Sequence, residues 1–143
     1  MPVLPCLRYE RKHDLPKPTG YPHEPVTIGE HLKKRRIDLK LLQRDVAKIF
    51  SVSEDCITYW ERGRSTPRVN YGPQIIEFLG YCPFNFDTTK LSGRLQTYRW
   101  RNGLSLKHLG KKLDVHGSTV GAWEEESSIP KEEVRRKLEM ILK

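Results

Sequence analysis

The sequence predicts an all-α protein in which two helical units follow an extended, proline-rich arm. Apolar residues recur at helical spacing in the middle of the chain. Six of the ten prolines lie in the first 27 residues. Residues 28–67 also align, without gaps, with the residues 63 positions later in the chain. The expected parts are an arm over residues 1–26, a first unit over 27–81, a linker over 82–90 and a second unit over 91–143.

The N-terminal arm combines proline with nearly balanced charges. Proline fixes φ and removes a backbone donor, so we expect residues 1–26 to be extended, partly disordered and tethered against the first unit. The alternative is a basic arm that enters a DNA minor groove. Its net charge of only about one unit makes that alternative weaker.

The segment Gln43–Pro67 predicts two short helices joined by a tight turn. Val46 and Phe50 mark the apolar face of the first helix, and Ile57 and Trp60 mark that of the second. Very few residues separate the two helical patterns. A helix, a tight turn and a second helix form a helix-turn-helix, whose second helix can lie in a DNA major groove.

Capping residues fix where the helices of the first unit begin and end. Ser53 is placed to accept a backbone N–H at the start of the second helix, and Gly63 is placed to end that helix. Thr27 and Glu30 form a capping box at the start of an earlier helix. A further helix is expected over residues 74–79, ending at Gly80.

One pattern in this segment resembles the lambda-repressor-like, Cro/C1-type (XRE) helix-turn-helix family. The matching residues are Gln43, Val46, Ala47, Val52, Ser53, Ile57, Trp60, Glu61, Gly63 and Pro67. The resemblance implies a DNA-binding domain, a phosphate contact from Gln43, and a buried ion pair between Arg36 and Glu61. Leu42 departs from the family, which prefers Ser or Thr at that N-cap, and Ser51 replaces a favoured glycine.

Residues at the start of the second helix, and basic residues after it, are the expected DNA contacts. Two of them, Glu54 and Asp55, are acidic. They could accept a hydrogen bond from cytosine, or they could favour the helix N-terminus and repel phosphate; both interpretations remain open. The predicted DNA-binding residues are Gln43, Arg44, Ser53, Glu54, Asp55, Thr58, Tyr59, Arg62, Arg64, Arg68, Lys107, His116 and Ser118.

The shifted alignment predicts a second, degenerate helix-turn-helix. Nine of 40 aligned positions are identical, and Arg99 and Glu124 repeat the expected ion pair. Ser105 restores the helix cap, but Leu106 replaces the phosphate-binding glutamine. We therefore expect the first unit to be the principal DNA reader. The second unit is either a weaker reader or a module for packing and dimerisation.

Composition and charge exclude several other classes of function. The net charge of +8 favours a polyanionic partner. No apolar run is long enough for a membrane span, and no cofactor loop, catalytic constellation or metal-ligand spacing occurs. The residues Cys6, His13 and His23 have no recognisable metal spacing. Three widely spaced cysteines favour free thiols in a reducing cytosol.

The expected function is therefore non-enzymatic. It is sequence-specific binding of double-stranded DNA, and the family resemblance implies a repressor-like transcriptional regulator of bacterial or phage type, cytoplasmic and nucleoid-associated. The chain could act as a homodimer or as an intrachain pseudo-dimer. The alternative is a protein-interaction module on the same fold, such as an antitoxin or a recombination accessory protein, because a fold alone does not determine function.

Overall fold

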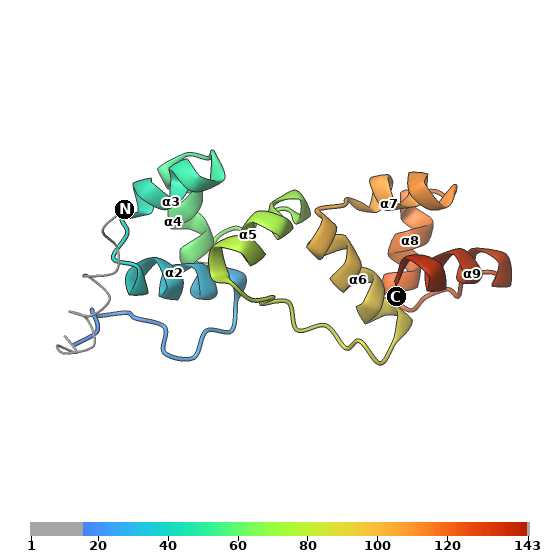
Figure 1. Ribbon diagram of the computed structural model, residues 1–143, viewed down its shortest axis with the longest axis horizontal. Helices are drawn as coiled ribbons and strands as arrows, with labels where there is room; N and C mark the ends of the chain where they lie inside the picture. Colours follow the sequence, from blue (N-terminus) through green and yellow to red (C-terminus); the bar gives the residue numbers. More distant parts are fainter. Residues whose placement is uncertain (1–15, 143) are drawn as a thin grey trace.

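The computed structural model describes residues 16–142, and every regular element within that range is helical (Figure 1). Helices α2–α5 form the first unit, and helices α6–α9 form the second. The bounds are α2 Ile28–Asp38, α3 Gln43–Phe50, α4 Glu54–Glu61, the 3-10 turn η1 Val69–Tyr71, α5 Gly72–Leu79, α6 Leu91–Asn102, α7 Leu106–Leu113, α8 Gly117–Glu124 and α9 Glu132–Ile141. The all-α fold class is thereby confirmed.

The helices of the second unit follow those of the first at the spacing seen in the sequence. Each of α6, α7 and α8 begins 63 residues after α2, α3 and α4. The left-handed backbone positions repeat too: Lys40, Ser51 and Gly63 have positive φ, and so do the residues 63 positions later. Those later residues are Gly103, Asp114 and Glu126. Turn geometry is thus shared even where the residue type is not.

Side-chain caps start the helices at the predicted places. The Thr27 hydroxyl accepts the Glu30 N–H at 3.1 Å, and the Glu30 carboxylate accepts the Thr27 N–H at 3.2 Å, so the capping box is confirmed. The backbone N–H groups of Val26 and Thr27 both donate to the Glu30 carboxylate and hold its pKa below its ordinary value. Ser53 caps α4 by accepting the Cys56 N–H at 3.3 Å.

Each unit has its own buried core. In the first unit the core includes Phe50, Ile57 and Trp60, which the apolar periodicity identified. Phe50 and Trp60 meet edge to face, with ring centroids 6.0 Å apart. Leu95, Leu109, Leu113, Val120, Trp123 and Leu138 form the core of the second unit.

The two units meet where η1 and α5 pack against α6 (Figure 1). Gly72 begins α5, and a Cβ atom added there would overlap the carbonyl oxygen of Trp100. The indole of Trp100 also lies 4.6 Å, centroid to centroid, from the ring of Phe84 in the connecting segment. We call the whole contact of η1 and α5 with α6 the seam. It is made by backbone as well as side chains, so it requires glycine at position 72.

The described part of the arm, residues 16–26, contains no helix and lies against α2. Lys17 and Tyr21 both donate to the Asp38 carboxylate, at 3.0 and 2.8 Å. Residues 1–15, with Cys6 and His13, lie outside the described residues. Cys56 and Cys82 are free thiols. No described helix combines the length and apolar character that crossing a bilayer requires.

Candidate nucleic-acid interface

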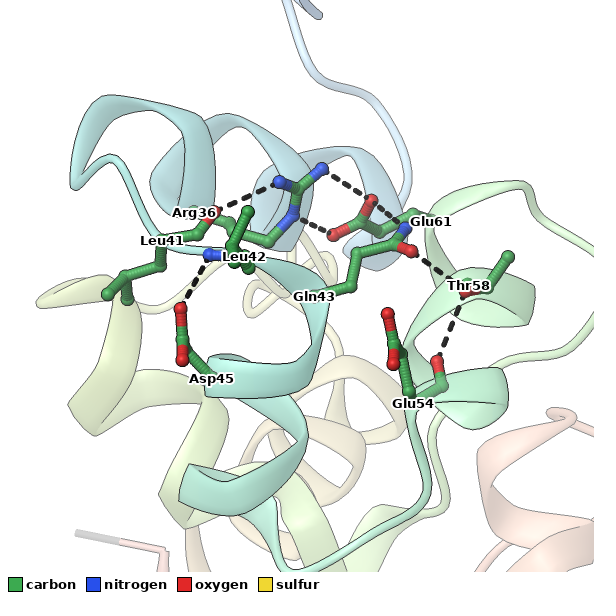
Figure 2. A network of polar contacts seen from close by, with 8 residues as sticks. All are labelled: Arg36, Leu41, Leu42, Gln43, Asp45, Glu54, Thr58 and Glu61. Atoms are coloured by element: carbon green, nitrogen blue, oxygen red, sulfur yellow. Dashed lines mark hydrogen bonds and ion pairs between the residues drawn. The ribbon is translucent and has the colours of Figure 1, made fainter.

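A buried ion pair fixes the position of α4 relative to α2 (Figure 2). The Arg36 guanidinium donates to both carboxylate oxygens of Glu61, at 2.6 and 3.0 Å. Its remaining nitrogen donates to the carbonyl oxygen of Leu41 at 3.1 Å. Glu61 is only 9% exposed, so the bidentate contact supplies the partner that a buried carboxylate needs. The ion pair predicted from the family resemblance is present.

Gln43 extends this network from α3 to α4 (Figure 2). Its side-chain amide donates to Glu61 at 2.9 Å, and its side-chain oxygen accepts from the Thr58 hydroxyl at 2.9 Å. Thr58 also donates to the backbone oxygen of Glu54 at 3.1 Å. Thr58 is half-buried, so it does not point outward as expected; it orients Gln43 instead. The side chain of Gln43 is held at the N-terminus of α3.

Asp45 compensates for the unusual residue at the start of α3. Leu42 provides no side-chain cap, as its apolar side chain requires. The carboxylate of Asp45 instead accepts the backbone N–H of Leu42 at 2.8 Å (Figure 2). A carboxylate in the first turn also complements the helix dipole. Sequence reasoning missed this role, although Asp three residues after the N-cap is the signal that could have indicated it.

Most of the predicted contact residues of the first unit are exposed. Ser53, Glu54 and Asp55 are exposed at the start of α4, and Tyr59 is 44% exposed one turn later. Gln43 and Arg44 line a hollow at the start of α3 together with Glu54. The basic residues Arg44, Arg62, Arg64 and Arg68 are all exposed. Hydrogen-bonding side chains are thus exposed on the short helix α4, and exposed cations follow that helix in the sequence.

The second unit has an equivalent ion pair but lacks the hydrogen bonds that, in the first unit, connect the ion pair to the neighbouring helix. Arg99 binds Glu124 at 2.5 and 2.9 Å and donates to the Leu104 carbonyl at 3.1 Å. Leu106 occupies the position of Gln43, and Gly121 occupies that of Thr58. A Cβ added at Gly121 would lie 3.4 Å from the Leu106 side chain. Neither residue has a side chain that can form a hydrogen bond, and Leu106 packs against the core of the second unit instead.

Few side chains on α8 can contact a ligand. His116 and Ser118 are exposed at the start of α8, and Lys107 is exposed on α7. Elsewhere on α8, Gly117, Gly121 and Ala122 offer little or no side chain. Gly117 packs so closely that an added Cβ would lie 2.9 Å from the backbone nitrogen of Lys107. Glu126, which follows α8, accepts from Ser92 at 2.9 Å. The second unit thus presents a small and weakly polar surface.

No cluster of histidine, cysteine and acidic residues that could hold a metal occurs within residues 16–142. Every buried side-chain nitrogen and oxygen in this part of the chain has a hydrogen-bond partner. The polar network at the start of α3 and α4 is therefore complete without a bound ion.

Comparison with known proteins finds one informative similarity. Over 42 residues the chain is 45% identical to the HTH-type transcriptional regulator DicA of Escherichia coli (strain K12). No family model matches the chain, and no solved structure matches it significantly. The aligned segment covers 29% of this chain and 31% of the relative, so the chain matches about a third of that protein's length. This similarity and the helical structure support an XRE-like helix-turn-helix.

Proposed function

We propose that this protein binds double-stranded DNA in a sequence-specific manner through α3 and α4, as a transcriptional regulator of the XRE type. One observation carries the proposal: the short α4 helix exposes hydrogen-bonding side chains while a buried network ties it to α2 and α3. The similarity to a protein named as a transcriptional regulator supports it. Such a role implies that the protein works in the cytoplasm, at the nucleoid.

The charge distribution around α4 supports binding to a duplex. Arg62, Arg64 and Arg68 follow the helix and are exposed, which suits contacts to phosphate. Tyr59, which is exposed, would contact a base edge or a thymine methyl group. Gln43 and the N-terminus of α3 would meet a phosphate, because backbone N–H groups and the helix dipole favour an anion there.

Glu54 and Asp55 would help the protein to select one DNA sequence over others. Both are exposed at the N-terminus of α4, where the helix dipole stabilises negative charge. A carboxylate can accept a hydrogen bond from cytosine N4 but repels phosphate. These residues would therefore weaken binding in any position on the duplex where they face phosphate. They would permit binding in the position where they face a cytosine.

A random-sequence selection followed by a gel shift at increasing salt tests the proposal. The expected result is one enriched motif and an affinity that falls steeply between low and moderate salt, because each phosphate contact releases counterions. No enriched motif, together with a stable protein complex in a pull-down, would contradict DNA regulation. That outcome would support the alternative, a protein-interaction module, for which exposed acids such as Glu54 and Glu125 would be the contact residues.

A further inference from the structure

The two sides of the seam come from non-equivalent parts of the two units. The first unit contributes η1 and α5, and the second contributes α6. In the repeat, however, α5 corresponds to α9, and α6 corresponds to α2. A pseudo-two-fold arrangement would bring the same surface of each unit into contact. The seam is therefore a head-to-tail contact, as in a direct repeat.

The seam is closely fitted, so it fixes the placement of the second unit. The start of α5 at Gly72 meets the backbone of Trp100, and a Cβ added at Gly103 would lie 3.2 Å from the carbonyl oxygen of Asn70. The contact between Trp100 and Phe84 lies beside these glycines. A contact between backbones leaves little space for one unit to rotate on the other.

The outer ends of the chain do not repeat the seam. The last helix, α9, contains neither the glycine nor the proline that begins α5, so its start is not built for the same close approach between backbones. At the other end, Tyr21 and Lys17 bind Asp38 at the end of α2. The end of α2 is thus covered by residues of the arm, whereas the equivalent helix α6 takes part in the seam.

The helix-turn-helix segments of both units lie toward one side of the molecule. Figure 1 shows α3 and α7 along the same edge, with α4 and α8 beside them. The second unit can contact phosphate there through Lys107 and Lys111, which are exposed on α7. Gly117 and Gly121 on α8 lack side chains that could bond to base edges.

We propose that one copy of the chain binds a DNA site without two-fold symmetry, in which the first unit reads bases and the second unit contacts phosphates on one fixed flank. This inference rests on the proposed function. It adds that the DNA site lacks two-fold symmetry and that the protein binds it in one orientation. A head-to-tail protein matches a duplex whose two halves differ, because operator symmetry follows protein symmetry.

The test combines selection, stoichiometry and footprinting with the full-length protein. The selected motif should be non-palindromic, and one chain should bind each duplex at saturation. A hydroxyl-radical footprint should extend beyond the motif on one side only. The variant Gly72→Val, which obstructs the seam, should lose protection on that flank and keep protection over the motif. Trp100→Ala provides a second seam variant that leaves the start of α5 unchanged.

Charge variants separate the roles of the two units. Replacing Lys107 and Lys111 with alanine should lower the salt dependence by about 0.9 in log–log slope for each lost phosphate contact, without changing the motif. Lys137→Ala, which removes an exposed cation from α9, should leave the slope unchanged. An unchanged slope in the Lys107/Lys111 variant would overturn the role given to the second unit.

The outcomes distinguish this inference from the proposed function. A palindromic motif bound by two chains would overturn the inference and leave sequence-specific DNA binding intact. A symmetric footprint around a single chain would also overturn it. If no motif is enriched and affinity does not depend on salt, the proposed function itself fails, and the inference fails with it.

Discussion

Arg36 and Glu61 form a bidentate ion pair with N–O distances of 2.6 and 3.0 Å, and Arg99 and Glu124 repeat it 63 residues later. In both pairs the arginine also donates to a backbone carbonyl five residues on. Each pair joins the first helix of a unit to its third. The repeated geometry shows that these ion pairs are part of the framework, whereas the polar side chains around them differ between units.

Breaking the first ion pair should destabilise the protein strongly. Glu61→Gln leaves the Arg36 guanidinium, whose side chain is 15% exposed, without its charge partner, so we expect a loss of about 3–5 kcal/mol in the free energy of unfolding. Urea denaturation measures this loss. The exposed pair Arg136–Glu132 is the control, and Glu132→Gln should cost less than about 0.5 kcal/mol. Equal losses would show that burial does not set the cost.

Gln43→Ala should weaken both DNA binding and the fold. The variant removes a hydrogen bond to the charged Glu61 and one from Thr58, at the place where a phosphate is expected. A hydrogen bond to a charged group contributes about 1.5–3 kcal/mol. Loss of the expected phosphate contact should therefore lower affinity on the order of tenfold or more, and loss of the bond to Glu61 should lower the free energy of unfolding. Leu106→Ala in the second unit should mainly reduce stability. If Gln43→Ala leaves affinity unchanged, the glutamine serves only the internal network.

Arg64→Ala and Tyr59→Ala should affect DNA binding in different ways. Loss of a phosphate contact at Arg64 should weaken binding to every sequence and reduce the salt slope by about 1. Loss of a base contact at Tyr59 should relax selectivity at one position, at a cost of about 1–3 kcal/mol. Equilibrium titrations on matched and mismatched duplexes measure both effects. His116→Ala should matter less than either, and equal losses from all three would mean that both units read DNA.

The pKa of His31 should lie below its ordinary value of 6.5. Burial lowers it first and the charge of Lys34 lowers it further, while Glu30 opposes both. The folded state therefore disfavours the protonated ring. The stability that the neutral ring contributes is complete above pH 6.5 and is lost as pH falls toward the folded pKa.

NMR titration of the His31 ring tests this prediction. Lys34→Gln should raise the pKa of His31 toward 6.5, because it removes a nearby positive charge, whereas Lys137→Gln on α9 should not. A His31 pKa above 6.5 in the unmodified protein would show that the carboxylate of Glu30 outweighs burial.

Much of the fold could be predicted because its signals are local. Thr27 and Glu30 are three residues apart, and their capping box follows directly from that spacing. Ser53 and Gly63 likewise mark the start and end of α4 through local backbone chemistry. The helix α5 begins at Gly72, two residues before the predicted start at residue 74, because η1 already directs the chain into a helical turn there.

The contacts that depend on distant residues could not be predicted from the sequence. The hydrogen bond between Gln43 and Thr58 spans 15 residues and converts an expected outward side chain into a positioning one. Gly72 looks like a helix-starting residue, but its lack of a side chain is needed for the approach of Trp100. Such packing requires the three-dimensional placement of both units, which local patterns do not contain.

The most direct test of the central claim is an equilibrium titration of the full-length protein on its selected duplex and on a scrambled duplex, at about 50 and 200 mM salt. We predict at least about 10³-fold tighter binding to the selected duplex, affinity that falls with salt on both duplexes, and loss of the preference in Tyr59→Ala. Equal affinity for the two duplexes in the unmodified protein, at either salt concentration, would contradict sequence-specific DNA binding through α4.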